Sequence, residues 1–148
     1  MTILSTDMSE AFDSFCHSLT INWMLIDSVA LSSLDLIRSF LHKRFNRVKI
    51  NDNISEWQTM ERGCPQSMAL GRLLWNMFQN DMSYHVAGEP NLTMYADHHQ
   101  LYVTGKTHEA VDSDLTSQGW QALAWYKNNF LLANPEKFQS LSINPSGN

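Results

Sequence analysis

Cysteine is scarce in this sequence, which contains only two such residues, Cys16 and Cys64. They stand far apart, and neither has a partner at the spacing of a zinc ligand set. A disulfide framework and a cysteine-based zinc site are therefore not expected. Two reduced thiols are typical of an intracellular protein, which is the location we expect, with nucleus and cytoplasm not distinguished.

Positive charge is also scarce, with 10 Lys and Arg against 15 Asp and Glu and a formal net charge of −5. Proteins that hold nucleic acid through its phosphates usually carry a basic face, and this balance does not suggest one. The one basic cluster runs from His42 to Lys49. Two interpretations remain open for it: a solvated helix end, or a patch that contacts a nucleic-acid backbone.

Long apolar runs are missing as well. No uninterrupted stretch reaches the ~18 residues that a membrane span needs, and the first residues lack the basic flank and apolar run of a signal peptide. We therefore expect no membrane association. Five Trp and seven Phe among 148 residues supply aromatic surface for a core, so one folded domain is expected and not a disordered chain.

The apolar pattern predicts a mixed chain of helices and strands. Apolar residues at helical spacing predict helices in three stretches: His17 to about Arg44, Pro65 to Met82, and Thr107 to Asn128. Within the first stretch, Ser32-Ser33 fits the start of a second helix. Strand patterns cover six: Ile3–Asp7, Arg47–Asn51, Ser55–Met60, Leu92–Ala96, Gln100–Thr104 and Ser140–Ile143. The fourth and fifth of these predict a hairpin whose polar tip is Asp97-His98-His99.

Two carboxylates stand at the ends of expected strands, Asp7 after the first and Asp97 at the hairpin tip. Strands that end side by side would bring these acids together at one sheet edge. Carboxylate pairs hold the two Mg²⁺ ions of polymerases, which lie roughly 3.5–4 Å apart. Spacing alone favours the simpler interpretation of two turn residues.

Histidines near the hairpin tip raise the question of a histidine-based zinc site. His98 and His99 are adjacent, and His85 is nearby in sequence. Adjacent residues of a strand point to opposite faces, so His98 and His99 are poorly placed to share one ion. We therefore expect no histidine zinc cluster, and we expect both tip histidines to be solvated.

Four segments carry recognisable motifs in a fixed order. Residues 6–14, TDMSEAFDS, are similar to an Asp followed by Leu-Ser-Lys-Ala-Phe-Asp, and residues 62–71, RGCPQSMALG, to Arg-Gly-x-Pro-Gln-Gly-Ser-x-Leu-Gly. Residues 92–102, LTMYADHHQLY, resemble a Tyr-Ala-Asp-Asp motif, and residues 131–137, LLANPEK, resemble Leu-x-Leu-Asn-Pro-x-Lys. In this order they resemble the first to fourth palm motifs of reverse transcriptases of non-LTR (LINE-type) retrotransposons. The motifs span residues 6–137, so the resemblance covers nearly the whole chain.

The resemblance implies an α+β fold, a polymerase-type palm whose antiparallel sheet carries a Tyr-Ala-Asp hairpin and packs on helices. Asp7 and Asp97 would then be the catalytic carboxylates and ligands of two Mg²⁺ ions, with Mn²⁺ as an alternative ion. The carbonyl of Met8 would add a ligand. Lys137 would be catalytic, lying close to the leaving pyrophosphate, where a cation stabilises developing charge or donates a proton.

The resemblance also implies how substrates would be held. Phe12 would be the steric gate beside the sugar of the incoming nucleotide and would favour deoxynucleotides. Gln66 would lie beside that nucleotide and the template. The implied partners are an RNA template, a DNA primer and deoxynucleotides. The simpler interpretations are a core aromatic for Phe12 and a polar residue at a helix start for Gln66.

The chain departs from the family pattern at several positions. His98 stands where the family has its second Asp, which removes one negative charge and offers nitrogen, a donor better suited to Zn²⁺ than to Mg²⁺. Ser67 replaces a Gly that would let the backbone approach the template closely. Smaller departures are Arg72 for Pro, Ala133 for Leu and Phe138 for Thr. We expect a severe loss of catalysis and weak metal binding.

The chain begins at the first palm motif and ends soon after the fourth, so fingers and thumb are expected to be absent. We assign residues 1–143 to a partial palm domain and 144–148 to a tail. The predicted function is an RNA-directed DNA polymerase fragment of retrotransposon origin, inactive as it stands. The alternatives are a residual nucleic-acid-binding module, and a module whose exposed palm faces dock on a protein partner.

Overall fold

The computed structural model describes residues 1–26, 29–65, 68–86 and 91–143. The chain divides into two compact units, one made of Met1–Ala11 with Gln79–Asn148 and the other of Phe12–Phe78. We call them the sheet unit and the helical unit. The predicted tail, residues 144–148, lies outside the described residues. Within the described ranges, no helix is both long and apolar enough to span a membrane.

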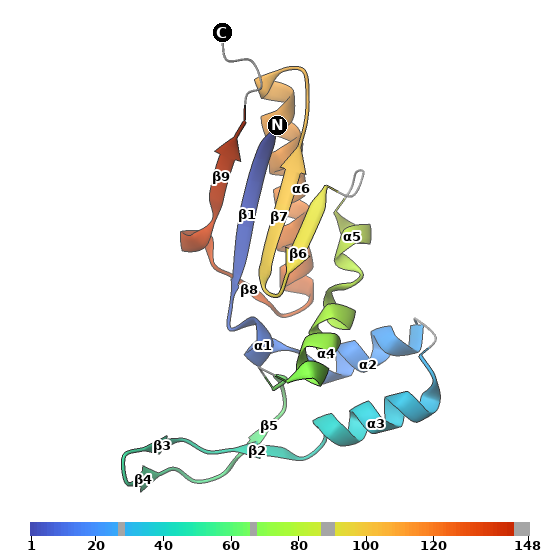
Figure 1. Cartoon of the computed structure of the whole chain (residues 1–148), viewed down its shortest axis with the longest axis vertical. Coiled ribbons are helices and arrows are strands. Elements are labelled where there is room, and N and C mark those ends of the chain that lie inside the picture. The colour runs from blue at the N-terminus through green and yellow to red at the C-terminus, as the bar shows by residue number, and fades with distance from the viewer. Residues whose placement is uncertain (27–28, 66–67, 87–90, 144–148) are drawn as a thin grey trace. The chain divides into compact units, whose positions relative to one another are not determined.

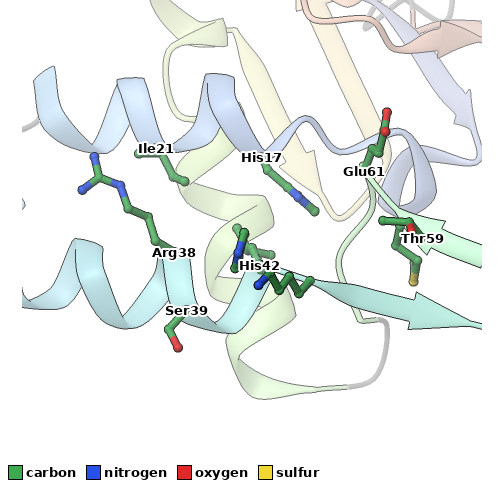
Figure 2. Close-up of a pocket in the computed structure, with 10 residues that line it drawn as sticks. His17, Ile21, Arg38, Ser39, His42, Thr59 and Glu61 are labelled. Carbon is green, nitrogen blue, oxygen red and sulfur yellow. The ribbon is translucent and has the colours of Figure 1, made fainter.

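The sheet unit is organised around one strand, β1 (Thr2–Ser9), which is hydrogen-bonded along both edges (Figure 1). On one edge it pairs with β7 (His98–Val103), which in turn pairs with β6 (Leu92–Tyr95). The other edge carries β9 (Gln139–Ser142) and the short β8 (Leu132–Ala133). All these pairs are antiparallel, which confirms the antiparallel sheet.

One long helix, α6 (His108–Asn128), covers a face of this sheet (Figure 1). Its start is fixed by Thr107, whose hydroxyl accepts a hydrogen bond from the backbone N–H of Ala110 at 3.3 Å. Its buried residues recur at helical spacing: Val111, Leu115, Gly119, Ala122, Trp125 and Tyr126. The helix predicted for Thr107 to Asn128 is confirmed.

The hairpin between β6 and β7 has a shorter tip than the sequence suggested. Tyr95 pairs with His98, which leaves only Ala96 and Asp97 in the turn. Ala96 has φ +54°, the left-handed conformation that tight two-residue hairpin turns require. His98 and His99 therefore belong to β7, and the prediction that both are solvated is wrong for His99, which is 0% exposed.

The helical unit contains α1 (Ala11–Ser14), α2 (His17–Ile26), α3 (Leu31–Leu41) and α4 (Ala69–Gln79), whose end residues Ala11 and Gln79 fall in the sheet unit. The predicted helical stretch after His17 is confirmed, although α3 starts at Leu31, one residue before the expected serines. The run expected from Pro65 to Met82 is divided, since α4 ends at Gln79 and α5 (Met82–His85) follows in the sheet unit. Phe15, Leu34, Leu74 and Phe78 are fully buried.

A ribbon of four short strands extends the helical unit between α3 and α4 (Figure 1). The sequence predicted two strands here, Arg47–Asn51 and Ser55–Met60, the second placed to return as the partner of the first. The structure instead has two separate pairs: β2 (Arg44–Asn46) with β5 (Gln58–Met60), and β3 (Lys49–Ile50) with β4 (Asn53–Ile54). Val48 and Ile50 are 60% and 65% exposed, so the alternation that predicted the strand does not correspond to a buried face.

Candidate active site

Asp7, Asp97 and His98 meet at one end of the sheet. Asp7 on β1 lies directly opposite His98 on β7, and Asp97 precedes His98 in the hairpin turn. One ligand atom from each of the three lies within 4.8 Å of the others. The geometry therefore brings together the two carboxylates that the sequence placed at strand ends, along with the histidine that replaces a third.

Asp7 is the buried member of this cluster, with a side chain that is only 4% exposed. Its Oδ1 accepts a hydrogen bond from Nζ of Lys137 at 3.0 Å. Its Oδ2 lies 2.7 Å from Nδ1 of His98 and makes no hydrogen bond. Oδ2 is thus a buried carboxylate oxygen without a hydrogen-bond partner among the described residues, an arrangement that is unfavourable unless a cation is nearby.

Lys137 reaches Asp7 because the backbone after β8 is tied to β1. The N–H of Asn134 donates to the carbonyl of Asp7 at 2.9 Å, and a single 3₁₀ turn (η1, Pro135–Lys137) follows. Pro135 at the start of that turn has the fixed φ that favours it. The Asn-Pro-x-Lys segment therefore sets the direction from which the ammonium approaches the carboxylate.

A buried chain of polar groups lies beside the cluster, on the opposite face of β7. His99 Nδ1 lies 2.8 Å from the hydroxyl of Tyr126 on α6, and His99 Nε2 lies 3.1 Å from Oε1 of Gln79. The Tyr126 hydroxyl lies 2.7 Å from the hydroxyl of Thr6 on β1. Burial, with a smaller contribution from His98, lowers the pKa of His99 to about 4.

Tyr126 responds to the same environment in the opposite sense. Burial raises the pKa of its phenol to about 12. The hydrogen bond with Thr6 lowers this pKa, and the negative charge of Asp7 raises it further. No role had been predicted from the sequence for either Tyr126 or His99. The signal for His99 was present in the alternation of β7, because His99, Leu101 and Val103 share the buried face.

The remaining predicted site residues lie elsewhere or cannot be placed. Met8 follows Asp7 in β1, is 2% exposed and pairs with Ala133 of β8. Phe12 belongs to the helical unit, where its ring centroid lies 5.0 Å from that of Trp75. Gln66 lies outside the described residues. The cluster of Asp7, Asp97, His98 and Lys137 is therefore the part of the predicted site that the structure brings together.

The cluster fits a single divalent cation better than a pair of Mg²⁺ ions. Asp7 offers one buried oxygen without a hydrogen bond and Asp97 offers a half-buried one. The third position offers imidazole nitrogen, which Mg²⁺ does not favour. With His98 neutral, two carboxylates and the Lys137 ammonium leave one net negative charge, which is too little to compensate two dications.

Removing the Lys137 ammonium should destabilise the fold, because Asp7 would keep a buried charge without its nearest cation. We expect Lys137→Met to lower the free energy of unfolding by about 1–2 kcal/mol. The expected loss is smaller than for a fully buried ion pair because Lys137 is 60% exposed, so solvent screens its charge. Urea unfolding at pH 7 measures the change. Lys127→Met, an exposed lysine at the end of α6, is the matched control and should change stability by less than about 0.5 kcal/mol. Equal losses in the two variants would contradict this role.

Comparison with known proteins agrees with the motif pattern. Residues 1–145 match the family model for reverse transcriptase (RNA-dependent DNA polymerase). The chain is 28% identical over 145 residues to a Drosophila melanogaster protein named "Probable RNA-directed DNA polymerase from transposon BS", covering 94% of this chain and 16% of that protein. This chain therefore spans less than a fifth of that relative's length.

A solved structure gives a second comparison. Apo telomerase from Candida tropicalis, truncated from its C-terminal domain, is similar with a TM-score of 0.65 and 9% identity, over 99% of this chain and 31% of that one. At this identity the likeness concerns the fold alone: helices with antiparallel sheets, consistent with a polymerase palm. Because the family model covers nearly the whole sequence, the chain belongs to the reverse transcriptase family.

Proposed function

We propose that residues 1–143 are a palm domain of a non-LTR (LINE-type) retrotransposon RNA-directed DNA polymerase whose nucleotidyl transfer is strongly impaired. The observation that carries the proposal is His98. It lies directly opposite Asp7, with its Nδ1 2.7 Å from Asp7 Oδ2, where the family pattern has a carboxylate. The polymerase origin is supported by the family match, and the impairment by the loss of a negative charge at the cluster.

Within this proposal, Asp7 and Asp97 are the carboxylates that face the reacting phosphates. A bound divalent cation would supply charge compensation for the transferred phosphate. Lys137 is held by Asp7 at 3.0 Å and is 60% exposed, so it remains accessible to a pyrophosphate leaving group. Phe12 and Gln66 are proposed as contacts of the incoming deoxynucleotide, and an RNA template and DNA primer as the other substrates.

Residual nucleic-acid binding without chemistry is the second candidate function, and the ribbon of the helical unit favours it. The guanidinium of Arg47 lies 4.5 Å above the ring of Trp57, and that ring is 58% exposed. An exposed aromatic ring next to basic side chains suits base stacking with phosphate contacts. Binding that weakens steeply with salt would favour this function. Binding of a protein partner on exposed palm faces would be insensitive to salt.

Single-nucleotide primer extension on an RNA template tests the proposal, with Mg²⁺ and separately with Mn²⁺. We expect His98→Asp to extend the primer at least about 100-fold faster than the natural chain, since it restores the missing carboxylate. This is the size of the loss, about 10²–10³ in rate, that follows removal of one oxyanion-hole donor in other enzymes. His108→Asp makes the same chemical change at an exposed position at the start of α6 and should have no effect.

Two results would contradict the proposal in different ways. If the natural chain extends the primer as fast as His98→Asp, the proposed impairment is wrong. If neither protein extends the primer and neither binds the primer–template duplex, the polymerase assignment of this segment loses its support. Binding without extension in both would favour the second candidate function.

A further inference from the structure

We propose that Asp7, Asp97 and His98 form a binding site for one divalent transition-metal ion of the Zn²⁺ class, in place of a pair of Mg²⁺ ions. The inference uses the proposed function only for the origin of the two carboxylates. The site itself stands on the geometry of this chain, in which the three ligand atoms lie within 4.8 Å of one another.

The donor set distinguishes this site from a magnesium site. Two carboxylate oxygens and one imidazole nitrogen are typical ligands of Zn²⁺ and related first-row ions, whereas Mg²⁺ prefers oxygen alone. His99 cannot be a fourth ligand, because its two ring nitrogens lie next to Tyr126 and Gln79 on the buried face. Three protein ligands and a water would complete four-coordination.

The unpaired oxygen of Asp7 is the independent observation that points to a cation. Oδ2 is buried and makes no hydrogen bond, although it lies only 2.7 Å from His98 Nδ1. A buried carboxylate oxygen in that situation is unfavourable unless a positive charge lies nearby. An ion bound by both Oδ2 and the imidazole would supply that charge.

The spacing of the ligand atoms allows one shared ion only after a side chain has rotated. Ligand atoms about 2.0–2.1 Å from Zn²⁺ lie roughly 3.3–3.4 Å from one another in a tetrahedral site, whereas the three ligand atoms here lie within 4.8 Å of one another. Asp7 Oδ2 is 2.7 Å from His98 Nδ1, but Asp97 Oδ1 is 4.0 Å from the other ring nitrogen, Nε2. An imidazole binds one ion through one nitrogen, so the Asp97 side chain or the 60% exposed His98 ring must rotate for both carboxylates to reach the same ion.

Lys137 supports the same site from outside. It donates to Oδ1 of Asp7, which fixes the orientation of the carboxylate and leaves Oδ2 free to face an ion. Metal-binding carboxylates are commonly held by such outer hydrogen bonds. With the single negative charge that two carboxylates and this ammonium leave, one dication would give the cluster a net charge of +1, whereas two would give +3.

Calorimetric titration with ZnCl₂ and separately with MgCl₂, without nucleic acid, tests the inference on the full chain. We expect the natural chain to bind one Zn²⁺ at this site with higher affinity than Mg²⁺. His98→Asp should weaken Zn²⁺ binding at least about tenfold and strengthen Mg²⁺ binding. Because His98→Asp adds a negative charge beside the buried Asp7, His98→Gln is titrated as well and should lose Zn²⁺ affinity without gaining Mg²⁺ affinity.

Two control variants address other groups with an affinity for Zn²⁺. Cys16→Ser removes a thiol that is not fully buried, and His85→Asn removes a histidine whose Nε2 lies 3.2 Å from a carboxylate oxygen of Asp81; neither should change the affinity. The Co²⁺ form gives a visible absorption band that should disappear in His98→Gln. The inference is overturned if both His98 variants bind Zn²⁺ as tightly as the natural chain, or if the natural chain binds none. Either result leaves the primer-extension test unaffected, so failure of the metal site and failure of the proposed function are distinguishable.

Discussion

Lowering the pH from 7 to 4 should reduce the free energy of unfolding by about 3 kcal/mol through His99 alone. Burial lowers the pKa of His99 to about 4, against an ordinary value of 6.5. Each pKa unit corresponds to about 1.4 kcal/mol of difference between the protonation states. The side chain is fully buried between Tyr126 and Gln79, so solvent does not screen this difference.

The direction of the effect follows from which state binds the proton. Above pH 6.5 His99 is neutral in both the folded and the unfolded chain, and its contribution to stability is complete. Between pH 6.5 and about 4, His99 is protonated in the unfolded chain but stays neutral in the folded chain, so the free energy of unfolding falls as the pH falls. Below about pH 4 both states are protonated and the contribution has been lost.

Urea unfolding at half-unit intervals from pH 4 to pH 7 measures this effect, and a second histidine provides the control. Carboxylates also titrate near pH 4, so the informative quantity is the difference between variants. His99→Gln should remove the extra loss of stability in this window, whereas His98→Gln, at a position 60% exposed, should keep it. Parallel curves for the natural chain and His99→Gln would show that the buried network does not depend on a neutral imidazole.

The meeting of Asp7 and Asp97 at one end of the sheet could be predicted from local patterns, whereas their role as metal ligands was expected only from the resemblance to a family. Asp7 ends the short apolar run that predicted β1, which the structure extends to Ser9, and Asp97 occupies the hairpin turn between β6 and β7. Antiparallel pairing of such strands brings these two residues together almost regardless of what surrounds them. The approach of Lys137 to Asp7 is different: nothing local predicts a contact between residues so far apart, and it was expected only from the resemblance to a family.

His99 shows why the rest was harder to predict. Whether the hairpin turn contains two residues or three depends on the backbone of Ala96, which adopts φ +54°. Alanine rarely adopts this conformation, so the sequence does not predict it. A shift of one residue in a strand exchanges its two faces. The tip histidine that was expected in solvent thus became a buried partner of Tyr126, with a pKa that the sequence could not indicate.

The ribbon of the helical unit illustrates a second limit. Alternation of Val48 and Ile50 predicts a strand with a buried face, yet both are more than half exposed and the strand pairs are only two or three residues long. Periodicity reports which residues share a face, but it does not report whether anything covers that face. Arg47, stacked on Trp57, is likewise a contact between segments that only the folded ribbon brings together.

Replacing Trp75 with alanine should lower the free energy of unfolding by about 3–5 kcal/mol, the largest single effect that we expect from a side chain. Trp75 is 1% exposed, and its ring centroid lies 5.0 Å from that of Phe12 and 5.6 Å from that of Phe78. The substitution removes a buried indole and leaves a cavity that these two rings cannot fill. Urea unfolding followed by far-ultraviolet circular dichroism measures the loss.

Trp120→Ala is the matched control, since this residue of α6 is 67% exposed and should change stability by less than about 0.5 kcal/mol. Trp75→Phe keeps an aromatic ring against Phe12 and should recover most of the loss. The same comparison bears on the role proposed for Phe12, because a ring that acts as a nucleotide gate must be held in a fixed position. If Trp75→Ala were no more damaging than Trp120→Ala, the packing of Phe12 on Trp75 would contribute little, and a fixed position for the Phe12 ring would lose its physical basis.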